Sequence, residues 1–315
     1  MRGRGVDVML LGVAAIWGSS YLAAQRAAQV APVEAVLLWR YFFAAAVCLG
    51  VMALARQRLR RAELQAGLLL GVTQALVLAL ETYGVAHTSA ANAGVLISVT
   101  IVLVPLLEAG VARRTPSRDL LLAAGVAVVG VALLTGGPTT IRSGDVLVLA
   151  AALVRTGHVV LIARMTRPQP GRTLRILPIT TVQLVVGTVL FAPVALLGGG
   201  ATGASAGGRV PASTWTPLSD PAFLWPTVYL ALGCSVFAFL AQTWAVQRTS
   251  ATRASLLLGT EPVWAVLVAA GIGGYVPGAI STLGAVLVVG ACYWGQAVER
   301  RVRPLEMAGE QRRMT

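Results

Sequence analysis

Residues 81–116 read ETYGVAHTSAANAGVLISVTIVLVPLLEAGVARRTP, and residues 242–277 read QTWAVQRTSATRASLLLGTEPVWAVLVAAGIGGYVP. Aligned at this offset of 161, residues 82–128 share 15 identical residues in 47 positions with the second stretch and its continuation, without a gap. The shared Thr-Ser-Ala and the matching prolines, Pro116 and Pro277, carry most of the weight, because neither is a common membrane pattern. The chain therefore contains two related halves.

The composition around this repeat is that of a membrane protein. Of the 315 residues, 57% are hydrophobic and 12% are charged, whereas a soluble domain carries about 25% charged residues. This composition excludes a soluble enzyme with an ordinary surface. A membrane span needs about 20 apolar residues, and the apolar runs predict ten helices, at 6–25, 33–55, 64–85, 91–112, 118–136, 145–164, 174–197, 222–246, 253–272 and 278–298.

Arginine supplies all of the 25 basic residues, which excludes a phosphate-binding loop or a Schiff base that depends on lysine. The net charge of +13 favours an anionic membrane surface over nucleic acid, because the arginines cluster between apolar runs. Twenty of them lie in the termini and in alternate loops, and the opposite loops hold only Arg26, Arg142 and Arg209. The positive-inside rule then predicts a multi-pass plasma-membrane protein with both termini in the cytoplasm.

Five helices per half is an odd number, so the second half enters the membrane in the opposite orientation. The predicted fold class is an all-α polytopic membrane protein with ten transmembrane helices in two inverted five-helix repeats. The expected repeats are 1–137 and 138–298, the latter with an outward flexible loop at 198–221, and a basic cytoplasmic tail follows at 299–315. Secondary transporters use inverted repeats and bind their substrates near the membrane midplane.

Ionisable residues inside a predicted span are rare and mark functional sites. Glu261 is the sharpest candidate, because Pro262 cannot donate the helical hydrogen bond to the carbonyl of Leu258. A freed carbonyl beside a carboxylate is typical of broken helices that line substrate or ion sites. The alternative is a structural kink with Glu261 paired to an arginine. Glu261 is also the best-placed proton carrier, whereas its repeat counterpart Thr100 cannot titrate.

Four further residues are candidates for substrate binding or coupling. Arg40 either binds a substrate carboxylate through its fork geometry or forms a buried ion pair with Glu81 or Glu34. Arg155 and His158 are three residues apart and therefore share a helix face. They either line the cavity or bond polar groups between helices. Glu81 lies near the end of its predicted helix, where reaching the interface is the alternative.

Secondary candidates are Thr100, the repeat counterpart of Glu261, and polar or aromatic residues in the other spans. Gln183 and Gln242 are either interhelical hydrogen-bond partners or ligand contacts, and Trp17 packs in the core or against an apolar part of the substrate. No metal site or cofactor is expected, because the cysteines all fall inside apolar runs, at Cys48, Cys234 and Cys292.

Several short motifs occur in an ordered series along the chain: Trp17-Gly18, Trp39-Arg40-Tyr41, His87–Gly94, Gly144-Asp145, Gln242-Thr-Trp244 and Glu261-Pro262. On these motifs, over residues 8–298, the chain resembles the EamA-type transporters of the drug/metabolite transporter superfamily. The resemblance implies a ten-helix carrier that exports amino acids, other small metabolites or drugs.

Taken together, the patterns predict a secondary transporter, not driven by ATP, that works by alternating access, and the resemblance implies that it exports amino acids or other small metabolites. The alternatives are a multidrug exporter of the same fold and an intramembrane lipid-modifying enzyme. The chain holds no HExxH or nucleotide-binding fingerprint, and no enzyme activity is expected. The expected partners are a small-molecule substrate and the lipid bilayer, without nucleic acid. Coupling to protons and a homodimer remain open.

Overall fold

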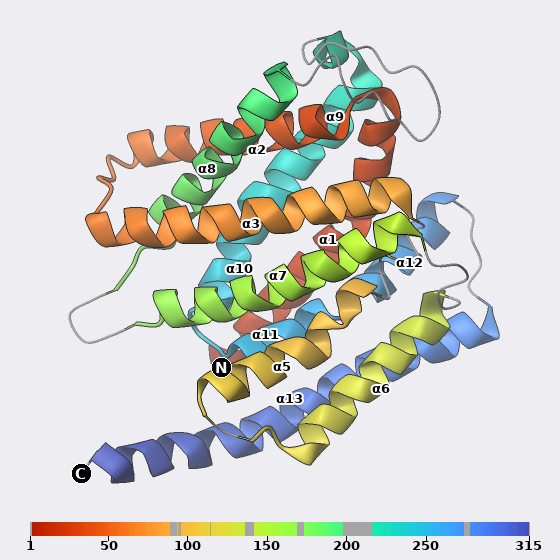
Figure 1. Cartoon of the computed structure of the whole chain (residues 1–315). Helices are drawn as coiled ribbons and strands as arrows, with labels where there is room; N and C mark the ends of the chain where they lie inside the picture. The colour runs from red at the N-terminus through yellow and green to blue at the C-terminus, as the bar shows by residue number, and fades with distance from the viewer. Residues whose placement is uncertain are drawn as a thin grey trace.

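A computed structural model describes residues 2–88, 93, 96–113, 115–135, 142–168, 173–197, 216–273 and 278–314. Every regular element in these residues is a helix (Figure 1). The α-helices are α1 (Arg2–Val30), α2 (Val33–Leu54), α3 (Arg61–His87), α5 (Thr100–Val111), α6 (Arg118–Thr135), α7 (Ser143–Thr166), α8 (Ile176–Leu197), α9 (Pro221–Ala231), α10 (Ala238–Val246), α11 (Ala251–Leu258), α12 (Glu261–Gly273) and α13 (Ala279–Met314).

The helices form because long apolar segments in lipid must satisfy every backbone N–H and C=O internally. In the described residues, seven helices are long and apolar enough to cross a membrane, and a shorter apolar helix runs over Leu96–Val111. The chain is therefore a multi-pass membrane protein. Described helices fall in each of the ten predicted ranges, but the count of ten membrane spans stays a prediction.

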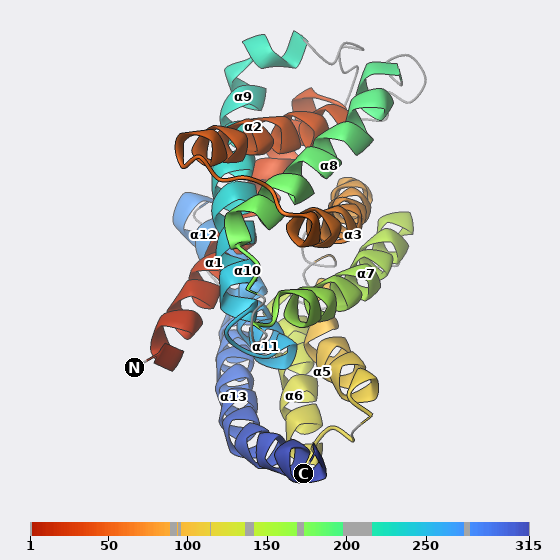
Figure 2. The same cartoon turned by 90° about the vertical axis from the view of Figure 1, so that its left-hand side faces the viewer.

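Two helix pairs close the opposite edges of the bundle. Figure 2 shows α2 and α8 packed together at one edge and α6 and α13 at the other. Between them, α3 packs on α7 and α8, while α9 packs on α1 and α2, and α10 packs on α1. Likewise α5 packs on α7, while α11 and α12 pack on α1. When the two predicted halves are interchanged, each contact is replaced by its counterpart. For example, the packing of α5 on α7 corresponds to the packing of α11 and α12 on α1, as a two-repeat architecture requires.

Two predicted helices are interrupted. The predicted 253–272 helix divides into α11 and α12, and the break falls at Gly259 and Thr260, directly before Glu261. The proline-dependent break is thus confirmed. The predicted 222–246 helix was expected to be continuous, but a π-helical turn, η2 (Leu232–Phe237), separates α9 from α10. π-Helical turns insert an extra residue and occur frequently at functional sites.

Small residues set the closest helix contacts. A Cβ atom placed on Gly67 of α3 would lie 2.5 Å from the Val182 Cβ, and one on Gly71 would lie 2.8 Å from the Val186 Cβ. This pair of glycines, four residues apart, lets α8 approach the backbone of α3.

At the ends of the chain, α13 continues to Met314, so the predicted tail begins inside a helix. Most of the predicted outward loop, residues 198–215, lies outside the described residues.

Candidate functional site

A buried ion pair lies at the centre of the helix bundle. The Arg155 Nη2 on α7 donates to the Glu261 Oε2 at the start of α12, at 3.0 Å. The Tyr21 hydroxyl on α1 donates to the other carboxylate oxygen, Oε1, at 2.8 Å. Glu261 therefore has both oxygens bonded, and all three side chains are buried. The break before Pro262 places this carboxylate at a helix start, close to the N-terminal dipole of α12.

A second carboxylate lies on the other side of the same guanidinium. The Glu81 Oε2 on α3 is 3.8 Å from the Arg155 Nη1, within ion-pair range but beyond hydrogen-bond distance. The Arg155 guanidinium also stacks over the Trp17 ring, 4.6 Å from its centroid. One arginine thus serves two carboxylates. It bonds Glu261 directly and leaves Glu81 with room for another partner.

Two small cavities meet at Arg155. The cavity on the Glu261 side has a volume of about 20 Å³ and is also lined by Thr100. The cavity on the Glu81 side has a volume of about 30 Å³. Its lining includes the predicted candidates Trp17, Arg40, Glu81, Arg155, His158 and Gln242. Each space is about the size of a water molecule, so the centre of the protein is closed in this conformation.

Arg40 forms neither of the ion pairs predicted for it. The Arg40 Nε donates to the Ser235 Oγ at 2.8 Å, and its Nη2 lies 3.4 Å from the Cys234 carbonyl oxygen. Both partners belong to the π-helix η2. Within the described residues, no carboxylate lies within ion-pair distance of the Arg40 guanidinium. Arg40 thus lines the Glu81 cavity without a carboxylate partner in the described residues, and its binding of a substrate carboxylate stays a prediction.

His158 shares a cavity with Arg155, as the spacing of three residues predicts. Its Nδ1 is 2.7 Å from the Thr73 Oγ1 on α3. The other ring nitrogen, Nε2, is buried and has no hydrogen-bond partner in the described part of the chain.

The secondary candidates divide. Gln242 and Trp17 line the Glu81 cavity, and the Trp17 Nε1 also donates to the Cys234 carbonyl at 3.1 Å. The Thr100 hydroxyl donates to the Ile97 carbonyl at 2.8 Å and borders the Glu261 cavity. Gln183 lies at the contact of α3 and α8, next to Gly71, and lines neither cavity. It belongs to the helix packing.

Four residues at the site were missed by sequence reasoning: Tyr21, Thr73, Gln74 and Ser235. Three of them are hydroxyl residues in apolar runs, a weak signal because Ser and Thr commonly bond their own helix backbone. Tyr21 follows Ser19-Ser20 one turn after Trp17, and this polar cluster in an otherwise apolar helix was the available indication.

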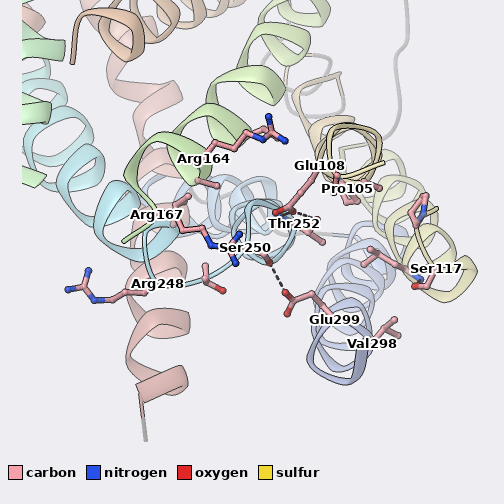
Figure 3. Close-up of a pocket in the computed structure, with 18 of the residues that line it drawn as sticks. Pro105, Glu108, Ser117, Arg164, Arg167, Arg248, Ser250, Thr252, Val298 and Glu299 are labelled. Carbon is pink, nitrogen blue, oxygen red and sulfur yellow. Dashed lines mark hydrogen bonds between the residues drawn. The ribbon is translucent and has the colours of Figure 1, made fainter. Parts of the chain in front are cut away.

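A wider cavity of about 680 Å³ opens at the arginine-rich end of the bundle (Figure 3). It is lined by Arg164, Arg167 and Arg248, while its carboxylates are engaged at the start of α11. Glu108 accepts from the Thr252 hydroxyl at 2.6 Å, and Glu299 accepts from the Ser250 hydroxyl at 2.7 Å.

This wide cavity approaches the Glu261 cavity along two helices. Pro105 of α5 and Val160 of α7 line the wide cavity, and their neighbours Val104 and Val159 line the small one. The two cavities therefore lie next to each other along α5 and α7, and the closed centre faces the arginine-rich end.

The fold and the site define a polytopic α-helical membrane protein with a charged cluster buried between its two halves. The EamA-like transporter family matches residues 5–136 and 142–294, one match for each half. The chain belongs to this family, which confirms the resemblance to EamA-type members of the drug/metabolite transporter superfamily. The protein is thus a multi-pass membrane transporter by family.

A solved structure described as "Crystal structure of protein" has the same fold, with a TM-score of 0.72 and 17% sequence identity. The alignment covers 95% of this chain and 99% of that chain. At this identity the similarity concerns the fold alone. No curated protein matches the chain.

Proposed function

We propose that the protein is a secondary carrier that alternates access to the Arg155 cluster from the two sides of the membrane. The observation that carries the proposal is the position of Arg155 between Glu261 and Glu81. The cluster joins α1 and α3 of the predicted first half to α7 and α12 of the second. Any movement of one half against the other therefore changes these ion pairs, which is the behaviour expected at the centre of an inverted-repeat carrier.

The closed centre and the wide outer cavity fit one state of such a cycle. A metabolite does not fit in spaces of about 20 and 30 Å³, so α1, α3, α7 and α12 must separate for substrate to enter. The wide cavity lies at the end that the arginine distribution assigns to the cytoplasm. Entry from that end favours export across the plasma membrane, with both termini in the cytoplasm.

The substrate class that suits the site is an amino acid or another small metabolite with both charges. Arg40 supplies a guanidinium for a carboxylate, and Glu81 supplies a carboxylate that is not hydrogen-bonded to Arg155. Trp17 adds an aromatic surface to the same cavity. Glu261 is the proposed coupling residue, and Thr100, which borders its cavity, cannot take over a proton.

A transport screen in proteoliposomes tests this function. Purified protein is reconstituted, and counterflow of radiolabelled amino acids, organic acids and cationic drugs is measured with and without ATP. We expect ATP-independent counterflow of at least one amino acid. Counterflow of cationic drugs alone would favour the multidrug alternative, and the absence of any counterflow would contradict the proposal.

Reporter fusions test the orientation. Fusions after Arg61, after Arg118 and in the tail should report the cytoplasm, and a fusion in the 198–221 loop should report the outside. A cytoplasmic signal from that loop would contradict the inverted repeat.

A further inference from the structure

The Nε2 atom of His158 is buried at the centre of the protein and takes no part in the Arg155 cluster described above. The His158 side chain is among the most buried in the protein, with a relative exposure of 2%, and its Nε2 has no hydrogen-bond partner in the described residues. Buried polar groups are nearly always paired, and an exception calls for an explanation. His158 lines the Glu81 cavity, so a bound molecule there can supply the missing partner.

The neighbouring Thr73 determines what this nitrogen can do. A hydroxyl has one proton, and the Thr73 Oγ1 lies 3.1 Å from each of the Leu69 and Leu70 carbonyl oxygens of its own helix. Threonine in a helix commonly donates its hydroxyl proton to a carbonyl of the preceding turn, and we assign the Thr73 proton in this way. With this assignment the Oγ1 accepts at its 2.7 Å contact with the His158 Nδ1, which places the imidazole proton on Nδ1.

The imidazole is neutral in this environment. Within the described chain, no carboxylate lies within ion-pair distance of His158. A second proton would create a buried charge without a counter-charge, which is strongly unfavourable. A neutral imidazole with its proton on Nδ1 presents a lone pair on Nε2. The cavity therefore receives a hydrogen-bond acceptor here, not a donor.

The rest of the cavity lining is divided between donors and acceptors. Arg40 and Arg155 are pure donors, Gln74 and Gln242 are amides, and Glu81 is a pure acceptor. Besides the two amides, two residues that act as acceptors, Glu81 and the His158 imidazole, thus line the same small space. Because an ammonium group has donors only, it can satisfy both acceptors, whereas a hydroxyl has one proton and a keto oxygen has none.

From this geometry we infer that His158 and Glu81 form the amine-binding subsite of the carrier, with Thr73 as the positioning residue that holds the acceptor nitrogen toward the substrate. The inference rests on the proposed transport function and deepens it. It predicts that a 2-amino acid is preferred over the 2-hydroxy acid of the same carbon skeleton. The preference should be roughly tenfold or more, the effect of one hydrogen bond to a charged group.

Thr73 provides a matched pair of variants. Thr73→Ser keeps the hydroxyl and should keep the preference, whereas Thr73→Val removes the acceptor that fixes the ring and should lose it. Competition of L-alanine and L-lactate, and of L-leucine and L-2-hydroxyisocaproate, against counterflow measures the preference. His158→Asn, which shortens the side chain, should lose the preference as well and decides the matter if Thr73→Val does not fold. Retained preference in Thr73→Val or His158→Asn, or lost preference in Thr73→Ser, would overturn the inference.

Nitrogen-15 NMR of the imidazole separates this inference from the proposed function, because it requires no transport. The chain has two histidines, so His87→Gln leaves the His158 signal alone. We expect the Nδ1–H tautomer in this background and with Thr73→Ser, and a changed tautomer population with Thr73→Val. An Nε2–H tautomer, or an imidazolium, in the His87→Gln protein would overturn the inference even if transport is observed. A wild-type protein without counterflow but with the Nδ1–H tautomer would instead contradict the proposed function.

Discussion

Glu261 and Glu81 lie on opposite sides of one arginine, yet their surroundings differ. Glu261 bonds Tyr21 and Arg155 through its two oxygens, and its side chain is 5% exposed. Glu81 is 3.8 Å from the guanidinium, and its side chain is 16% exposed. The first carboxylate is committed to holding the cluster together, and the second is available to a ligand. This difference assigns substrate binding to Glu81, whereas the direct ion pair with Arg155 makes Glu261 the proposed coupling residue.

Removing the shared cation is the largest test of this comparison. Arg155→Gln leaves both carboxylates without their counter-charge, and breaking a buried ion pair from one side costs about 3–5 kcal/mol of stability. We expect a loss of this size in the free energy of unfolding, measured by denaturant titration in detergent, together with loss of transport.

Double variants then separate the two carboxylates. Combining Arg155→Gln with Glu261→Gln should recover stability, with an interaction energy in the upper part of the range of about 0.5–3 kcal/mol for contacting residues. Combining it with Glu81→Gln should recover less. Equal recovery in the two cycles would show that the two carboxylates are equivalent.

Backbone contact at Glu261 offers a second, smaller test. A Cβ atom at Gly18 of α1 would lie 2.6 Å from the Glu261 carbonyl oxygen and 2.8 Å from the Ala265 nitrogen. Gly18→Ala should therefore push α12 away from α1 and lower stability by about 1–3 kcal/mol, the usual effect of overpacking. Gly12→Ala on the same helix is the control, because a Cβ there meets nothing within 4 Å. The same loss in both variants would argue against a tight contact at Glu261.

Arg40 tests the available side of the cluster. Arg40→Gln removes a charge that holds no carboxylate in the described chain, so protein yield should change little. The apparent KM for a carboxylate-bearing substrate should rise by roughly tenfold, the effect of a hydrogen bond to a charged group. Ser235→Ala, which removes the protein partner but keeps the charge, should affect KM less. Loss of folded Arg40→Gln with normal transport by the remaining fraction would favour a structural role.

The features that the sequence alone could predict are those that depend on residues close together in the chain. The helix break before Pro262 follows from a missing N–H, and the helices follow from apolar runs, so both could be predicted from short stretches. The shared cavity of Arg155 and His158 follows from helical spacing. These features need no knowledge of distant residues.

The pairing at the centre depends on tertiary packing, which a single sequence does not contain. Arg155 and Glu261 are separated by 106 positions, and Tyr21 and Glu261 by 240. Glu81 was ranked below Glu261 because its predicted helix ended at 85. The actual α3 extends to His87, and its contact with α7 brings Glu81 to Arg155. The sequence does not predict the π-helix η2, because its six residues contain no proline and only a single glycine, Gly233.

Gradient-driven transport by two single variants tests the account most directly. Uptake into proteoliposomes with an imposed pH gradient is compared with gradient-free counterflow for Glu261→Gln and Glu81→Gln. A proton moving down 100 mV releases about 2.3 kcal/mol, enough for roughly fifty-fold accumulation. Glu261→Gln should lose this accumulation and retain counterflow, because glutamine mimics the protonated acid. Glu81→Gln should retain the response to the gradient with a raised KM for amine-bearing substrates. Unchanged accumulation in Glu261→Gln, or its loss in Glu81→Gln alone, would contradict the assignment of coupling to Glu261 and substrate binding to Glu81.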